Sequence, residues 1–175
     1  MLYPSSEIQW MAVPSAVVAS TTIQEMFKRY SHKVQNVTSA IAEVTFGPEI
    51  DNIKIVDMYG WTELYSIQKT TGVSEWLEIH CETDRAIICN NHTTIPVYDP
   101  DNKSTEFHGR TVYSYEQRTA DNLTSDCILR ILRVRQSDPE FIKIKSIKQL
   151  DIISDGYTIQ TKSRFFNAND IYFIR

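Results

Sequence analysis

The stretch WLEIHCETDRAIIC, from Trp76 to Cys89, decides the fold class. Its first six residues alternate between apolar and polar side chains, and a second apolar run begins at Ala86. The four residues between these runs, Glu82 to Arg85, are polar and typical of a hairpin turn. We therefore predict two antiparallel strands joined by a short turn.

Further strand signals follow this hairpin outward in both directions. Apolar or alternating runs rich in β-branched residues predict strands at 16–18, 53–56, 127–134, 141–147, 157–161 and 171–174. Helical signals are few: a possible cap threonine and a Glu in the first turn predict a short helix between Thr21 and Tyr30. One more turn is expected at 119–124, and the polar stretches 31–50 and 99–110 are expected to be loops. The chain is thus predicted to be all-β with one or two short helices.

Composition narrows the class of protein. With 175 residues the chain suits one domain, and its formal net charge of −4 argues against a phosphate-binding surface. The residues Arg130, Arg133 and Arg135 alternate with apolar ones, so we interpret them as the exposed face of a strand. We expect no membrane segment, no signal peptide over Met1 to Trp10 and, from three cysteines, no disulfide framework. A cytoplasmic location is therefore expected.

Four sequence segments resemble the conserved blocks of inteins, the self-excising domains of protein splicing. DRAIICNNHTTIPV (Asp84–Val97) resembles block B, an apolar strand followed by T-x-x-H, with Cys89 in place of the threonine and His92 as the histidine. GYTIQTKSRFFNANDI (Gly156–Ile171) resembles block F. AVPSAVVASTTI (Ala12–Ile23) resembles the opening block A, and ADNLTSD (Ala120–Asp126) resembles a segment found between blocks B and F.

The resemblance implies a fold and a domain boundary. The fold would be the compact, pseudo-symmetric horseshoe of the Hint (hedgehog/intein) class. Residues 1–11 would be flanking, extein-like sequence, and residues 12–175 would form a single mini-intein without a homing endonuclease.

The resemblance also implies chemistry at the junction between Met11 and Ala12. In the family the first intein residue, a Cys or Ser, attacks the carbonyl just upstream in an N-to-S acyl shift, and ligation of the flanking sequences follows. Ala12 stands at that position and cannot act as a nucleophile, so we hypothesise that it replaces a cysteine and inactivates this form. His92 would protonate the leaving nitrogen, and Cys89 would hold the scissile bond.

The C-terminal block departs from the family pattern. Thr158 stands at the position of the block F Asp, Phe165 at the His, Ile174 at the penultimate His and Arg175 at the terminal Asn. These departures put C-terminal cleavage in doubt.

Partners and rival functions complete the expectations. We expect a monomer that acts on flanking extein segments, with a complementary fragment if the domain is split, and with no cofactor, metal, nucleic acid or membrane partner. One rival is a metal site built from Cys89-x-x-His92 with His80 and Cys81. Other rivals are a β-rich binding or adaptor module without catalysis and a Hint domain that cleaves without ligating.

Overall fold

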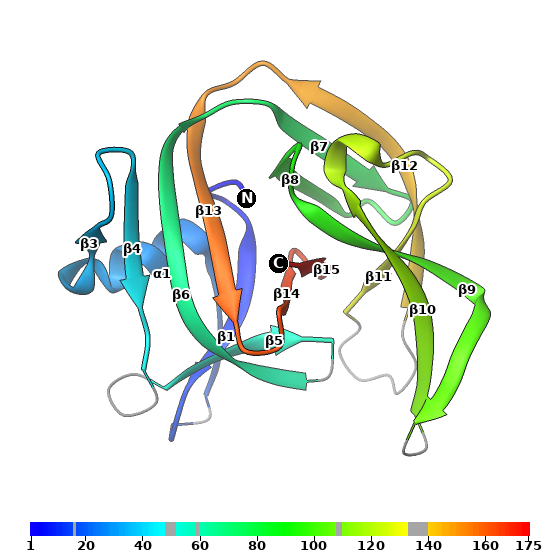
Figure 1. Cartoon of the computed structure of the whole chain (residues 1–175), viewed down its shortest axis with the longest axis horizontal. Coiled ribbons are helices and arrows are strands. Elements are labelled where there is room, and N and C mark those ends of the chain that lie inside the picture. The colour runs from blue at the N-terminus through cyan, green and yellow to red at the C-terminus, as the bar shows by residue number, and fades with distance from the viewer. Residues whose placement is uncertain (16, 48–51, 59, 108–109, 133–139) are drawn as a thin grey trace.

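The computed structural model describes residues 1–175 with the exception of 16, 48–51, 59, 108–109 and 133–139. Most of its regular structure is antiparallel β-strand. The strands curl into the open ring seen in Figure 1, and both chain ends are drawn inside that ring. The prediction of an all-β chain with few, short helices is confirmed.

The first sheet is built around one long strand, β6. Its order is β2-β1-β5-β6-β4-β3, and β13 also pairs with β6. The first residues of β6 pair with β5, and its later residues pair with β4 and β13. The strands are β1 (Glu7–Ala12), β2 (Val18–Thr22), β3 (Gln35–Asn36), β4 (Ile41–Thr45), β5 (Ile53–Asp57), β6 (Gly60–Val73) and β13 (Ser154–Thr161). The prediction of a loop at 31–50 is wrong in part, because β3 and β4 form a small hairpin there.

The second sheet contains the hairpin predicted at Trp76 to Cys89. Its order is β14-β15-β11-β12-β7-β8. Trp76 pairs with Asn90 and Ile79 with Ile87, which confirms the hairpin. Arg130 is half-buried, with its guanidinium carbon 5.5 Å from the centre of the Tyr172 ring, so it does not lie on an exposed strand face as interpreted. Arg133 and Arg135 lie outside the described residues. The strands are β7 (Trp76–Cys81), β8 (Ala86–Asn90), β11 (Ile128–Ile131), β12 (Glu140–Leu150), β14 (Phe165–Ala168) and β15 (Ile171–Ile174).

A long two-stranded arm connects β8 with β11, two strands of the second sheet. It consists of β9 (Thr94–Phe107) and β10 (Arg110–Thr119), and it extends away from the ring in Figure 1. The predicted loop at 99–110 is therefore wrong over most of its length. The backbone pairs of an antiparallel hairpin do not require an apolar face, so the polar composition of this stretch concealed it.

The helices are short, and the sequence signals located them well. The helix α1 (Ile23–Arg29) starts at Thr22, whose hydroxyl accepts from the Glu25 backbone N–H while the Glu25 carboxylate accepts from the Thr22 backbone N–H. This reciprocal capping box satisfies two donors that the first turn leaves open. The described residues also contain two 3₁₀ turns, η1 (Ser31–Lys33) and η2 (Ala120–Asn122). No described helix has the length and apolar character needed to cross a membrane.

The main apolar core includes the residues predicted to flank the domain. Leu2, Ile8 and Trp10 are between 1% and 6% exposed and belong to the same cluster as the interior residues of both sheets. Leu2 donates to and accepts from the Tyr157 backbone (2.7 and 2.9 Å), and the Tyr3 N–H donates to the Ile88 carbonyl. Residues 1–3 thus lie between β13 and β8 and link the two sheets. Residues predicted to be flanking sequence therefore pack within the core of the domain, and the boundary at Met11–Ala12 stays a prediction.

Candidate functional site

The backbone of Met1 is bound by the loop that follows β8. The Met1 amine donates to Thr93 Oγ1 at 2.6 Å, and that hydroxyl donates to the Met1 carbonyl at 2.9 Å. The Asn90 backbone N–H donates to the same carbonyl at 2.9 Å. We call this arrangement the Met1 cradle and define it as Cys89, Asn90 and Thr93 around Met1.

Burial shifts the pKa values of both ionisable groups in the Met1 cradle. It lowers the pKa of the Met1 amine to about 6, because the charged form loses its water, and the neighbouring Cys89 opposes this effect. Burial also raises the pKa of the Cys89 thiol to about 11, against the amine charge and a hydrogen bond with Thr93. Cys89 is fully buried, so it packs as a small apolar side chain and is not poised as a nucleophile.

Hydrogen bonds to Ser74 and Glu75 hold the loop of the Met1 cradle in place. Asn90 is 4% exposed, and its side-chain amide donates to the Ser74 carbonyl at 2.9 Å. The Asn91 backbone N–H donates to the carbonyl of Glu75, which has a left-handed φ of 61°. These contacts fix the direction in which Thr93 approaches Met1.

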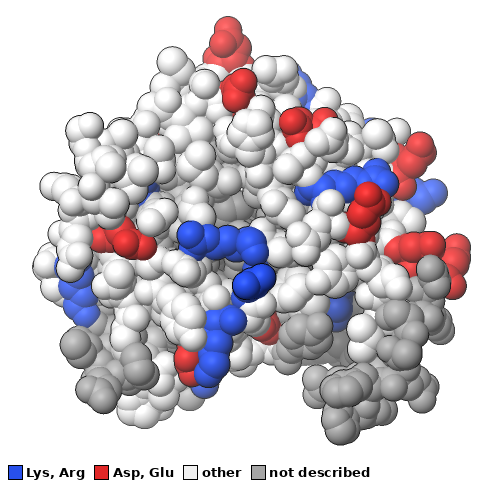
Figure 2. Space-filling view, viewed as in Figure 1, with Lys and Arg blue, Asp and Glu red and all other residues white. Residues whose placement is uncertain are grey.

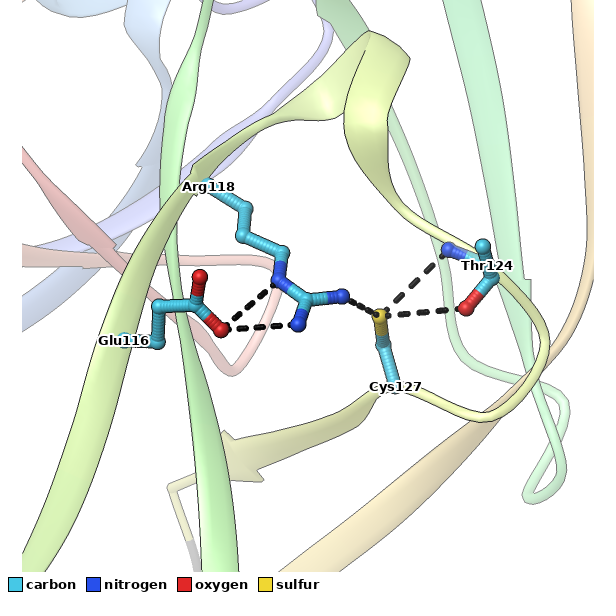
Figure 3. A network of polar contacts seen from close by, with 4 residues as sticks. All are labelled: Glu116, Arg118, Thr124 and Cys127. Atoms are coloured by element: carbon cyan, nitrogen blue, oxygen red, sulfur yellow. Dashed lines mark hydrogen bonds and ion pairs between the residues drawn. The ribbon is translucent and has the colours of Figure 1, made fainter.

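The η2 turn supports the same loop from its other side. Ala120 and Asp121 donate backbone N–H groups to the carbonyls of Thr93 and Asn91. Beyond η2, the Cys127 sulfur accepts from the Thr124 backbone N–H at 3.4 Å and from an Arg118 Nη1 at 3.5 Å. Figure 3 shows how this sulfur ties the turn to β10, with Arg118 held in place by the Glu116 carboxylate.

The loop brings Cys89 to Met1 but leaves His92 outside the contact. His92 is exposed, and its backbone N–H donates to the Asn90 side-chain oxygen at 3.2 Å. The side chain that meets the residue-1 nitrogen is that of Thr93, one residue further on. The structure therefore places Thr93, and not His92, beside the residue-1 nitrogen.

The residues of the predicted junction lie elsewhere. Met11 pairs with Val18 on one side and with Lys54 on the other, and Ala12 pairs with Ile53. A peptide between two neighbouring strands is poorly placed for attack at its carbonyl, because its backbone N–H and C=O groups are held in hydrogen bonds of the sheet and its conformation is fixed. Neither residue is at the loop that carries His92.

The predicted C-terminal residues are spread over the last three strands. Thr158 is half-buried in β13, next to Tyr157, and continuing the Leu2–Tyr157 register places it opposite Met1. Phe165 packs on a separate aromatic cluster with its ring centre 5.9 Å from that of Tyr115. Ile174 is 6% exposed in the strand paired with β14, and Arg175 is exposed, with its N–H on the Arg164 carbonyl at 2.9 Å.

The geometry does not assemble the rival metal site. In the β7–β8 register Cys89 lies opposite Leu77, whereas His80 lies opposite Ala86, at the other end of the hairpin. Among the described residues no group of three or more His, Cys, Asp or Glu side chains could hold a metal ion. Figure 2 shows a mostly uncharged face, with acidic side chains chiefly toward its top and right and a short run of Lys and Arg near its centre.

Comparison with solved structures decides the fold. An intein from a hyperthermophile superimposes with a TM-score of 0.75 at 12% identity, covering 99% of this chain and 98% of that one. This is the fold of inteins. The transcription factor IIB Mvu mini-intein (TM-score 0.77, 14% identity, all of both chains) and the TvoVMA intein (0.76, 13%, 98% and 95%) share it. No family model and no curated protein sequence matches the chain.

Within this intein fold, three residues of the Met1 cradle are not among the site residues predicted from the sequence. The sequence places Met1 in flanking sequence, and its block B resemblance points to Cys89 and His92 instead of Asn90 and Thr93. The signal that could have found them is spacing alone: Asn90-x-x-Thr93 has the same three-residue interval as Cys89-x-x-His92. Only the chain path shows which of the two faces residue 1.

Proposed function

We propose that this chain is an intein-type self-processing domain whose N-terminal junction lies at residue 1, not at Met11–Ala12. The observation that carries the proposal is the 2.6 Å contact between the Met1 nitrogen and Thr93 Oγ1. In the chemistry that the intein resemblance implies, the residue-1 nitrogen is the leaving group of the acyl shift. A side chain that contacts this nitrogen is placed to hold it or to protonate it. The loop supplying that side chain lies within the segment that resembles block B, Asp84–Val97.

We further propose that the residues now present leave the junction inactive. A Met thioether carries no proton to lose and is at best a weak hydrogen-bond acceptor, so Met1 cannot start an N-to-S acyl shift. Thr93 has no group that titrates near neutral pH, and Ile174 and Arg175 replace the family's C-terminal His and Asn. The inactivation previously placed at Ala12 therefore moves to residue 1. The expectations of flanking extein partners and of a split form stay predictions.

The test compares two cysteine variants under identical conditions. A peptide tag is fused upstream of residue 1, and Met1→Cys is made alone and with Thr93→His; Ala12→Cys with the same tag is the matched control. Each protein is incubated with a small thiol and weighed by mass spectrometry. We expect loss of the tag at the bond before residue 1 in Met1→Cys with Thr93→His, slower loss in Met1→Cys alone, and no cleavage before residue 12.

The outcomes separate the assignments. Cleavage between Met11 and Cys at position 12 would restore the original junction. Dependence of the Met1→Cys reaction on His92, tested with His92→Ala, would return the proton-donor role to that residue. If every variant folds and none is cleaved, the better account is the second candidate function, a binding or adaptor module.

That second candidate is a binding or adaptor module on a Hint scaffold. It is favoured by one specific observation: Met1 stands at the proposed nucleophile position, and Thr158 and Phe165 stand where block F of the family carries Asp and His. Such a domain would keep its flanking sequences attached and tolerate His92→Ala without loss of function.

A further inference from the structure

Gly156 occupies a position in β13 that its own backbone does not explain. It is buried, and its φ lies outside the left-handed region that favours glycine. A glycine within a strand weakens it, and its usual justification is the close approach of another group. The reason must therefore be sought in the space beside it.

That space is filled by the side chain of residue 1. A Cβ added to Gly156 would lie 3.1 Å from the Met1 sulfur, 3.0 Å from Val73 Cγ2 and 3.3 Å from Trp76 Cη2. These contacts are tighter than most real Cβ contacts, so an alanine methyl would press on the thioether and on both walls, and these neighbours would have to shift by a few tenths of an ångström. We call Gly156, Val73 and Trp76 the residue-1 socket.

The walls of the socket are fixed. Trp76 is fully buried, and its indole N–H donates to the Val73 carbonyl at 2.9 Å. The Tyr3 ring packs edge-on against Trp76 with the ring centres 5.3 Å apart. The socket therefore cannot easily widen to take a different side chain.

Met1 is thus held at two points. Its backbone is bound by Asn90 and Thr93, and its side chain enters the socket on β13. Because the two contacts involve different strands, the fit of the side chain determines where the residue-1 nitrogen sits relative to Thr93.

We propose that the residue-1 socket selects the side chain at residue 1, with Gly156 as the specificity-determining residue. The socket takes a long, unbranched, flexible apolar side chain, the shape of Met. A β-branched side chain is stiff at χ1 and would push its second branch against the walls. Alanine or cysteine would leave the socket partly empty. The role of this selection at a splice junction rests on the proposed function, whereas the fit of the side chain in the residue-1 socket does not.

The test is a double-mutant cycle on the full chain, made with Met1→Ala and Gly156→Ala. Each change should destabilise the protein alone, and the pair should be less damaging than their sum, with a coupling of about tenfold in the unfolding equilibrium constant. The contact of the new methyl with Val73 is common to both backgrounds and cancels in the cycle. Gly47→Ala is the matched control, since an added Cβ there meets nothing within 4 Å.

A second readout reports on the residue-1 nitrogen alone. The Met1 amine is modified with a soluble acylating reagent at pH 8, and peptide mass mapping follows residue 1 separately from the lysines. Gly156→Ala should raise the rate at residue 1 about tenfold, and Gly47→Ala should leave it unchanged. If Gly156→Ala does not fold, Met1→Ile on the unchanged socket should raise the same rate several-fold.

Additive effects in the cycle, or an unchanged labelling rate in these variants, would overturn the proposal. Neither readout depends on cleavage, so failure of the thiol experiment on Met1→Cys would leave the socket standing. Conversely, cleavage of Met1→Cys together with no energetic coupling between residues 1 and 156 would support the junction at residue 1 and contradict the proposed role of the residue-1 socket.

Discussion

Ile8→Ala tests most directly whether the first eleven residues belong to the domain. Ile8 is 1% exposed in β1, where it pairs with Thr21, and it is part of the main core. The change removes three buried carbon atoms, which at about 0.8 kcal/mol each amounts to roughly 2.4 kcal/mol of transfer free energy. The cavity left behind adds to this, so we expect a loss of about 3 kcal/mol in the free energy of unfolding.

The assay is urea denaturation followed by tryptophan fluorescence and circular dichroism. The midpoint should fall with the slope unchanged, and the melting temperature should drop by roughly 6–12 °C for a chain of this size. Ile153→Ala is the matched control, because Ile153 is 77% exposed and its truncation should change stability by less than about 0.5 kcal/mol. If Ile8→Ala behaves like Ile153→Ala, residues 1–11 are a flank and the reasoning from the Met1 cradle fails.

Three further predictions concern the Met1 cradle, the thiols and the helix cap. Folding lowers the pKa of the Met1 amine from 8.0 to about 6, so the folded state disfavours the protonated amine. The free energy of unfolding should therefore rise between pH 6 and pH 8 by on the order of 2 kcal/mol. Urea titrations at both pH values should show this rise, and a chain acetylated at Met1 should not show the contribution of the amine. Cys81, Cys89 and Cys127 are all buried, and burial raises the pKa of Cys81 and Cys89 to about 11. Ellman's reagent at pH 8 should therefore detect less than one fast-reacting thiol in the native protein and three in urea. Fast reaction of Cys89 in the native state would show that the Met1 cradle opens. Thr22→Ala removes the cap of α1 and should cost about 1 kcal/mol, while Thr22→Ser should cost much less, as measured by thermal melting; equal losses would mean that the hydroxyl is not the stabilising group.

Local chemistry in the sequence was sufficient for several elements. The alternation from Trp76 to Cys81 and the turn at Glu82 to Arg85 predicted the β7–β8 hairpin. Successive side chains of a strand point to opposite faces of the sheet, so a half-buried strand shows alternating apolar and polar residues in its sequence. The capping pair of Thr22 and Glu25 located α1 for the same reason, since both partners are three residues apart. The order of the intein-like segments predicted the fold that the structural comparisons support.

Only the tertiary structure shows which residues surround residue 1, where we propose the junction to lie. The Met1 cradle joins residue 1 to Asn90 and Thr93, and the residue-1 socket joins the same residue to Gly156, so each contact spans many tens of residues. Cys89-x-x-His92 and Asn90-x-x-Thr93 are equally spaced, and a shift of one residue changes which side chains face residue 1. Composition and spacing carry no information on that register, because it is set by the backbone bonds of Leu2 to Tyr157 and of Tyr3 to Ile88. The sequence by itself therefore determined an all-β, intein-like chain, and only the packing of its first three residues between β13 and β8 showed that residue 1 meets the block B segment.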